Sequence, residues 1–345
     1  MKKLETERLI LGEYTINDFE AVHNYASSSE NTVFMSWGPN SEEETREFLN
    51  NAIKAADNDT NNTDSQKEYL YAVRLKESGK LIGGCDISVK KDEASLGWIL
   101  HRDYWKQGYG TEIGRALLRF GFDDLHLRRI IALCDAENSG SCRIMEKIGM
   151  RREGLFLEHR EPHKKSDGKY GDELLYAIVK SEWETLAEIE YYNASPCVFD
   201  GFMDLPELSD GVIHLVCMAK NSAIPEKKWV PSYDFAICLG SEKIGSIDLR
   251  IGYTGGLYYG GQIGYTIDEK NRGNGYAVCA CRALQPVAKF HAMTRLLITN
   301  NHINTASKRV CEKLGARFIR TARLPPWHDL YLAGQRFENI FEWNI

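Results

Sequence analysis

The sequence predicts an α+β protein that contains two copies of one domain. Its 345 residues exceed what one hydrophobic core usually supports, so two domains of about 150 residues are expected. The segment "NSGSCRIMEKIGM" from Asn138 recurs as "NTASKRVCEKLGA" from Asn304. Each copy also alternates segments typical of strands with segments of helical periodicity. A repeat this long indicates a duplicated domain and excludes a solenoid.

The spacing of matched residues shows where the copies differ in length. Asn, Ser and Gly of the repeated segment recur 166 positions apart, and two further glycine pairs 167 apart, but Gly83 and Gly245 are only 162 apart. The second copy therefore carries about five extra residues, which fall in "GYTGGLYYGGQ" at 252–262. This glycine-rich stretch is predicted to be a long β-hairpin loop.

The first copy is predicted to form a meander of three strands at 69–75, 80–89 and 94–101. A glycine turn, a helix at 111–125, a buried strand at 128–135, a helix at 139–149 closed by Gly149, and a last strand at 173–179 follow. The second copy repeats this order with strands at 233–239, 243–251, 261–267, 295–300 and 339–345. Its helices begin at Tyr276 and Thr305, and Pro286 should kink the first of them.

The beginnings of the copies differ. The first has room for two early helices, at 16–26 and 41–56, the second capped by Ser41. The second copy has only about a dozen residues at that place, so two helices cannot fit. We therefore expect a first domain at 1–180, a partly helical connector at 181–210, and a second domain at 211–345 without those helices.

Composition narrows the class of protein. Nine scattered cysteines without a CxxC suit reduced thiols, and Cys279 and Cys281 point to different faces of a predicted helix, so no metal is expected. No apolar run approaches the roughly 18 residues of a membrane helix and no secretory signal is recognisable, so we expect a cytoplasmic protein. A net charge of −6 makes nucleic acid an unlikely partner, although "HKK" at 163–165 could form a local contact. The oligomeric state is left open.

Both copies place glycines directly before a helix, in "WKQGYG" at 105–110 and "RGNGYA" at 272–277. Glycine permits positive φ and a close approach of ligand to backbone, and the helix start offers unpaired N–H groups. Such a turn suits an anion, most plausibly a diphosphate, or else is only a tight connection. Neither the Walker pattern nor GxGxxG is present.

"RGNGYA" resembles the Arg/Gln-x-x-Gly-x-Gly/Ala pyrophosphate loop of the GNAT superfamily of acetyl-CoA-dependent N-acetyltransferases. "WKQGYG" is similar to the variant in the branch that acetylates ribosomal-protein N-termini. The resemblance covers roughly residues 4–180 and 212–345. It implies two acyl-CoA N-acyltransferase domains, each a mixed, mostly antiparallel sheet flanked by helices. It also implies an acyltransferase (EC 2.3.1 type) that uses acetyl-CoA, releases coenzyme A and needs no metal.

The resemblance further implies which residues contact the coenzyme. Backbone amides of the two glycine turns would hold the diphosphate, and the strand before each turn would offer an N–H to the thioester oxygen. Asn138 and Asn304 would line the pantetheine arm, although each could equally be a helix cap, or both. The coenzyme-binding residues implied are Ile99, Leu100, Gln107, Gly108, Tyr109, Gly110, Thr111, Asn138, Ile267, Arg272, Gly273, Asn274, Gly275, Tyr276, Ala277 and Asn304.

The catalytic groups are less defined. Many family members carry a tyrosine as proton donor where this chain has Met145 and Cys311, so Ser141 and, by analogy, Ser307 are the candidate acids. Either serine could instead only pack its helix start. Glu158 or Glu161 in "LEHREPH" could act as base through water, but a solvated charged loop, with His159 and His163 as surface residues, explains the segment as well.

Two functions follow from the resemblance. The first is acetyl transfer to a primary amine of a small molecule or of a peptide N-terminus by direct attack. In the alternative, one copy is catalytic and the other is a coenzyme-binding or structural module. We expect the first copy to perform the better defined chemistry, because it has room for the helices that wall the acceptor site in the family.

Overall fold

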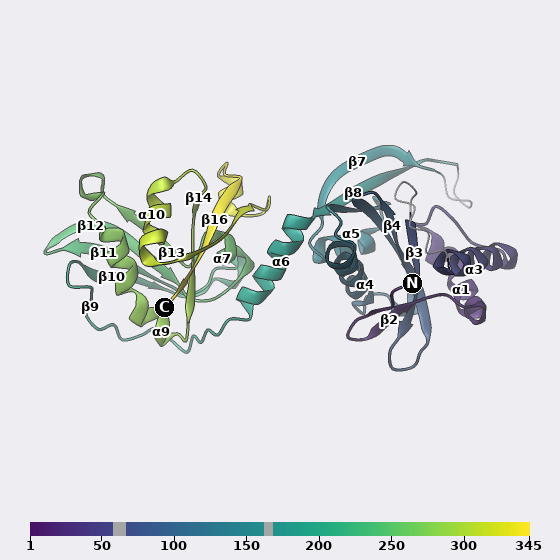
Figure 1. The fold of residues 1–345 in the computed structure, drawn as a ribbon, viewed down its shortest axis with the longest axis horizontal. Helices are drawn as coiled ribbons and strands as arrows, with labels where there is room; N and C mark the ends of the chain where they lie inside the picture. Colours follow the sequence, from purple (N-terminus) through teal and green to yellow (C-terminus); the bar gives the residue numbers. More distant parts are fainter. Residues whose placement is uncertain (58–66, 162–167) are drawn as a thin grey trace. The chain divides into compact units, whose positions relative to one another are not determined.

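A computed structural model describes residues 1–57, 67–161 and 168–345 and divides into two compact units, Met1–Glu184 and Thr185–Ile345 (Figure 1). The basic segment at 163–165, with His163, lies outside the described residues. Across the parts of the chain that are described, no helix is both long and apolar enough to cross a membrane.

The N-terminal unit contains one eight-stranded sheet in the order β1-β2-β3-β4-β5-β6-β8-β7. All neighbouring strands are antiparallel except β5 and β6, which run parallel. The strands are β1 Leu4–Glu5, β2 Leu9–Gly12, β3 Lys67–Leu75, β4 Leu81–Lys90, β5 Glu93–Leu100, β6 Arg129–Asp135, β7 Arg151–Arg160 and β8 Gly171–Val179.

Helices cover both faces of this sheet (Figure 1). On one, the α1/α3 face, α1 (Phe19–Ala26) and α3 (Glu42–Asp57) pack around a buried cluster that includes Tyr14 and Tyr25, with the short η1 (Ile16–Asp18) and α2 (Ser29–Thr32) beside them. On the other, the α4/α5 face, lie α4 (Tyr109–Arg119), the π-type turn η3 (Phe120–Asp124) and α5 (Ser139–Lys147), with η2 (Arg102–Tyr104) before α4. Ser41 caps α3, since its hydroxyl accepts from Glu44 N at 3.2 Å.

The C-terminal unit splits the corresponding sheet in two. One sheet has the order β13-β12-β11-β10-β9 and the other β14-β16-β15. Their strands are β9 Leu208–Ser209, β10 His214–Asn221, β11 Ser232–Leu239, β12 Glu242–Arg250, β13 Ile263–Ile267, β14 Arg295–Asn301, β15 Arg317–Arg323 and β16 Phe337–Asn344.

The helices of this unit differ from those of the first. Between β10 and β11 there is only the three-residue η4 (Pro225–Lys227), and η5 (Glu269–Asn271) precedes α8. One face carries α8 (Tyr276–Ala283), α9 (Gln285–Phe290) and α10 (Thr305–Leu314), and Pro286 lies in the first turn of α9, where the predicted helix is interrupted. The other face carries α7 (Gly255–Gly260) and the end of α6 (Lys180–Asn193). Helix α6 begins in the N-terminal unit and ends in the C-terminal unit. The remaining helix, α11 (Asp329–Leu332), has four residues.

Two sequence expectations are wrong. The glycine-rich segment predicted as a hairpin loop forms helix α7, because the Thr254 hydroxyl caps Leu257 N at 3.1 Å and Tyr258 and Tyr259 become buried. Each copy also has a strand that was not predicted, β7 and β15. Both are edge strands with mostly exposed side chains, so they lack the apolar alternation that identifies a strand.

Candidate active site

The two glycine turns have the same backbone conformation. Gly108 and Gly275 have φ of 88° and 83° and directly precede α4 and α8. Two residues earlier, Lys106 and Gly273 are also left-handed, with φ of 59° and 86°. The sequence identified the glycines, but nothing in it indicated that Lys106 adopts the conformation of Gly273.

Each turn presents a row of backbone N–H groups. Within the described residues, the amides from Gln107 to Thr111 have no hydrogen-bond acceptor, and neither do those from Gly273 to Ala277. The Arg272 amide, by contrast, donates to the Glu269 carbonyl at 3.3 Å. Unpaired amides at the positive end of a helix suit an anionic ligand such as a diphosphate.

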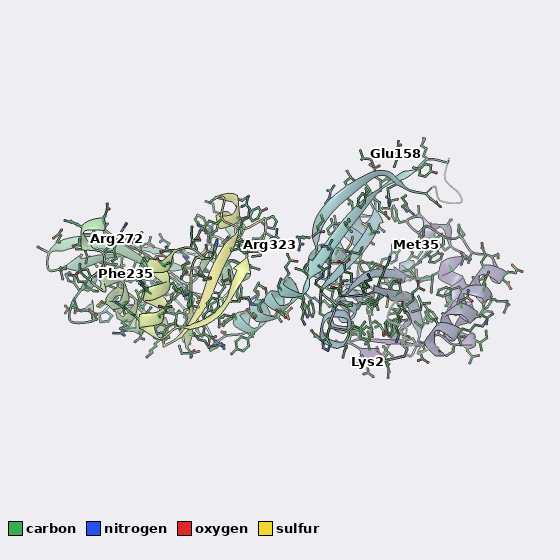
Figure 2. All side chains as sticks on the ribbon, turned by 45° about the horizontal axis from the view of Figure 1, so that its top comes forward. Lys2, Met35, Glu158, Phe235, Arg272 and Arg323 are labelled. Carbon is green, nitrogen blue, oxygen red and sulfur yellow. The ribbon has the colours of Figure 1, made fainter. Side chains whose placement is uncertain are left out.

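A side chain ties each turn to the end of the preceding strand. Trp105 Nε1 donates to the Leu100 carbonyl at 2.8 Å, and Arg272 Nε donates to the Ile267 carbonyl at 3.0 Å. Arg272 lies on the surface of the C-terminal unit in Figure 2. Trp105 and Arg272 occupy corresponding positions, so different side chains make the same bond.

Arg8 adds a brace in the N-terminal copy. Its guanidinium donates to the Gln107 carbonyl at 3.1 Å, forms an ion pair with Glu112 of α4 at 2.7 Å, and lies 4.3 Å from the centre of the Tyr109 ring. Strand register places Val212 at the corresponding position of the C-terminal copy, so that turn has no such brace.

Both sheets open beside their turn. Strands β5 and β6 pair only as far as Leu96 and Ala132 and then separate. In the C-terminal copy, β13 and β14 belong to different sheets, and Gln262 N donates to the Leu297 carbonyl at 2.8 Å where they meet. The gap that follows is flanked by two strands and runs toward the turn, which suits an extended ligand.

Hydrogen-bond alternation shows which amides face the opening. His101 N donates to the Ile82 carbonyl of β4, and Asp268 N to the Ile244 carbonyl of β12. Because successive amides of a strand point to opposite sides, those of Leu100 and Ile267 face away from these neighbours, toward the opening. The Ile99 amide faces β4 and is therefore not available to a ligand there.

Asn138 and Asn304 cap the helices that follow the opening. Their side-chain oxygens accept from Ser141 N at 3.0 Å and Ser307 N at 3.1 Å. The Ser307 hydroxyl is 2.8 Å from the hydroxyl of Tyr265, whose pKa is raised by burial. The Ser141 hydroxyl has no partner among the described residues, and its copy has Trp98 in place of Tyr265. Sequence reasoning did not single out Tyr265.

The positions of the usual family tyrosine cannot supply a proton. The side chains of Met145 and Cys311 are 0% exposed. Burial raises the pKa of the Cys311 thiol to about 12, and Asn300 Nδ2 lies 3.7 Å from its sulfur. Both residues therefore serve as core.

The segment with Glu158 is a strand and not the charged loop expected. Glu158 lies in β7 with φ of 49°, at an irregularity of the β7–β8 pairing, and its amide donates to Asp172 at 2.9 Å. Its side chain is exposed toward the outer end of the β7–β8 ribbon (Figure 2). Glu161 is exposed as well, just after the strand. His159 is 2.8 Å from the Glu173 carboxylate of β8.

Other carboxylates occupy the α1/α3 face beside the opening. Asp86 of β4 shares this face with Leu70 of β3, which packs against α1 and α3. Glu173 also lies on it, since Tyr176, three residues later, contacts Glu146 of α5 on the opposite face. The sequence contained one overlooked signal: Asp86 recurs as Asp248, in "CDI" and "IDL".

The two copies differ in how this face is covered. In the N-terminal copy, Leu133 of β6 is 43% exposed next to the opening. In the C-terminal copy, the corresponding residue, Thr299 of β14, is partly buried. Leu297, which corresponds to the partly buried Ile131, is 1% exposed and packs with Tyr258 and Tyr259 of α7 and Tyr192 of α6. The face that is open in the first copy is therefore filled by the chain itself in the second.

Comparison with known proteins decides the family. The sequence model of one protein family, the acetyltransferase (GNAT) domain, matches residues 8–151 and 213–317 of this chain. The chain belongs to the GNAT acetyltransferase family. It is an acyltransferase with two GNAT domains, and the family uses acetyl-CoA.

Individual relatives each match about half of this chain. The uncharacterized N-acetyltransferase YnaD of Bacillus subtilis is 34% identical over 182 residues, which are 52% of this chain and 98% of that protein. The uncharacterized N-acetyltransferase p20 of Bacillus licheniformis is 26% identical over 189 residues, 53% of this chain and 99% of that protein. A GNAT-family acetyltransferase structure from Bacillus anthracis is 34% identical with a TM-score of 0.45, covering 52% of this chain and 99% of that one.

Proposed function

We propose that the chain transfers acetyl from acetyl-CoA to a primary amine, of a small molecule or of a peptide N-terminus, by direct attack, and that the N-terminal copy performs the turnover. The observation that supports this most is the uncovered face beside the β5–β6 opening, with Leu133 43% exposed. In that copy, an amine could approach a donor lying in the opening across a face that no helix of the described residues fills. The contrast with the C-terminal copy favours the assignment.

The residues present suit the coenzyme in both copies. The free amides of Gln107–Thr111 and Gly273–Ala277 would hold the diphosphate at a helix start. Asn138 and Asn304 would line the pantetheine arm while capping their helices. The amides of Leu100 and Ile267 face the openings and would donate to the thioester oxygen as charge develops there.

Proton transfers need further groups. The Ser141 hydroxyl, at the start of α5, would protonate the departing thiolate, and Ser307 would occupy that place in the C-terminal copy, where Tyr265 already binds it. Glu158 and Glu161 are both exposed, so the amine proton would reach either only through water.

The C-terminal copy suits a coenzyme-binding module better than a second acetyltransferase site. Gly261, at the end of α7, lies so close to β14 that an added methyl group would be 3.1 Å from the Leu297 carbonyl. Helix α7 and its buried tyrosines would therefore hinder an amine that approaches the opening from this face. We propose that this copy binds acetyl-CoA and contributes little turnover.

Glycine substitutions in the two turns test the assignment. Gly108→Glu and Gly275→Glu each bring a carboxylate to the place of the diphosphate, while Gly108→Asn and Gly275→Asn tolerate positive φ without charge and serve as controls. Calorimetry with acetyl-CoA should give two sites in the parent and one in each glutamate variant. Coenzyme A release with a panel of primary amines should be lost in Gly108→Glu and largely kept in Gly275→Glu. No binding by the parent, or turnover lost only in Gly275→Glu, would contradict the proposal.

A further inference from the structure

A carboxylate on one strand of each copy lies over a glycine of the next strand. Asp86 of β4 is directly opposite Gly97 of β5, and a side chain on Gly97 would collide with the Asp86 carboxylate. Asp248 and Gly264 repeat the arrangement on β12 and β13. Gly97 follows Leu96, the last residue of β5 that pairs with β6. The space left by glycine thus places a carboxylate at the head of the opening.

In the N-terminal copy this carboxylate is unengaged. Within the described residues, Asp86 has no hydrogen bond and no ion pair, and the titratable groups around it are Glu68 of β3, Cys85 of β4 and Tyr14. Burial raises the pKa of Asp86 to about 6, and the negative charge of Glu68 adds to the rise. A carboxylate in this setting can accept a proton near neutral pH.

Two other carboxylates of the α1/α3 face, those of Asp135 and Glu173, are already paired. Asp135 forms an ion pair with Arg160, whose guanidinium also donates to the Met35 carbonyl at 2.7 Å. Glu173 is bound by His159. These pairs hold the long β7 strand and the segment around Met35 against the sheet, which leaves Asp86 as the better proton acceptor of the three.

In the C-terminal copy the matching carboxylate is engaged. Arg250 Nε is 3.0 Å from an Asp248 oxygen, and Arg250 Nη1 donates to the carbonyls of Gly260 and Gly261 at 2.8 and 3.1 Å. Burial raises the pKa of Asp248 as well, but the Arg250 guanidinium opposes that rise, and it also holds the end of α7 beside this carboxylate. The residue corresponding to Arg250 in the N-terminal copy is Ser88, which carries no charge.

We propose that Asp86 is the general base of the N-terminal copy and that Arg250 withdraws the corresponding carboxylate, Asp248, from this role in the other. The inference rests on the acetyl transfer proposed above. Asp86 takes one proton from the acceptor ammonium and later releases it to solvent. The neutral amine then forms a bond from nitrogen to the thioester carbonyl carbon, the carbon–sulfur bond breaks, and sulfur keeps its electron pair. The second nitrogen proton passes to sulfur through the Ser141 hydroxyl, giving an amide and coenzyme A.

Matched amide substitutions in the full chain test this. Asp86→Asn keeps the shape and removes the base, and Asp248→Asn does the same at the engaged position of the other copy. Coenzyme A release would be followed from pH 5 to 9 with spermidine, benzylamine and a tripeptide with a free N-terminus. We expect kcat/KM to fall about a hundredfold in Asp86→Asn, within the usual range for losing a general base. In Asp86→Asn, kcat/KM should also decline less toward acidic pH than it does in the parent. In Asp248→Asn, kcat/KM and its pH profile should match those of the parent.

A second variant, together with a binding measurement, distinguishes loss of the base from loss of the fold. Ser88→Arg places beside Asp86 the guanidinium that engages Asp248, so it should also lower kcat/KM, while calorimetry should still show two acetyl-CoA sites in both Asp86→Asn and Ser88→Arg. Asp86→Asn with parental kcat/KM and pH profile, or equal losses in Asp86→Asn and Asp248→Asn, would overturn the inference while leaving acetyl transfer intact. No amine-dependent release by the parent would overturn both the function and the base.

Discussion

The two domains share the half of the site that suits the coenzyme and differ in the half that would receive an amine. Both have the left-handed turn before a helix, the capping asparagine and the separated strands. Helices α1 and α3 leave the opening accessible in the first, whereas α7 and α6 fill that face in the second. The difference between the domains shows that the face beside the opening can be covered by different helices while the turn at the helix start keeps its conformation.

The largest effect is expected at Glu338, a glutamate that is buried in the C-terminal copy, whereas the corresponding glutamate of the N-terminal copy is partly exposed. Glu338 is 2% exposed, and burial raises its pKa to about 7, whereas Glu173, at the corresponding position, binds His159. A raised carboxyl pKa means that the folded state holds the proton more tightly, so stability falls as pH rises from about 4.5 through 7. Glu338→Gln should remove this fall and stabilise the C-terminal unit at pH 8 by up to about 3 kcal/mol.

Denaturant unfolding of the full chain at pH 5 and pH 8, with the two units followed separately by hydrogen exchange, would measure this. Glu173→Gln is the matched control and should give no such gain, because Glu173 has a partner and is less buried. A stability of the C-terminal unit that does not change between these pH values would contradict the role given to Glu338.

A smaller effect is expected at the brace of the first turn. Arg8→Ala removes the bonds to the Gln107 carbonyl and to Glu112. Since Arg8 is 42% exposed, we expect acetyl-CoA affinity at the N-terminal site to weaken only about threefold to tenfold. Calorimetry should show the C-terminal site, with Val212 at this position, unchanged. Equal weakening of both sites would mean that Arg8 acts through something other than the turn.

The smallest effect concerns the left-handed lysine. Lys106 has φ of 59° where the other copy has Gly273. Lys106→Gly relieves that strain but loosens the unfolded chain, so the N-terminal unit should gain about 0.5 kcal/mol. The reciprocal Gly273→Lys should lower the stability of the C-terminal unit by about 1 kcal/mol. Thermal unfolding would check both, and a destabilised Lys106→Gly would show that the lysine side chain itself supports the turn.

Much of the fold could be predicted because its signals are local. The repeat, the meanders, the helix pattern after each turn and the Ser41 cap all depend on neighbouring residues. Helix α7 could not be predicted in this way, because six glycine-rich residues form a helix only when Tyr258 and Tyr259 find a core to enter. Strands β7 and β15 could not be predicted either, because most of their side chains are exposed and show no apolar alternation.

The candidate site likewise contains residues that the sequence identifies and residues that it does not. The turns were visible as glycines before a helix, but Asp86 and Glu173 come from strands far from the turn along the chain. Their position depends on sheet register, and register is not encoded in any short motif. Charge alone makes Glu158 and Glu161 candidate bases, but exposed charge is common on β7. Asp86 differs from them because it is partly buried and burial raises its pKa.

Gln262 has a mechanical consequence for the C-terminal domain. Its side-chain oxygen accepts from Leu297 N at 2.5 Å, its backbone N–H donates to the Leu297 carbonyl, and its side-chain nitrogen donates to the Gly252 carbonyl at 3.1 Å. The side chain thus imitates the peptide group of a missing neighbour at the seam between the two sheets. Because Gln262 reaches Leu297 with its backbone N–H and its side-chain oxygen together, one residue joins β14 to the start of β13, although these strands belong to different sheets. The opening of this domain therefore begins at a contact made by one amide side chain, where a continuous sheet would have a row of backbone bonds.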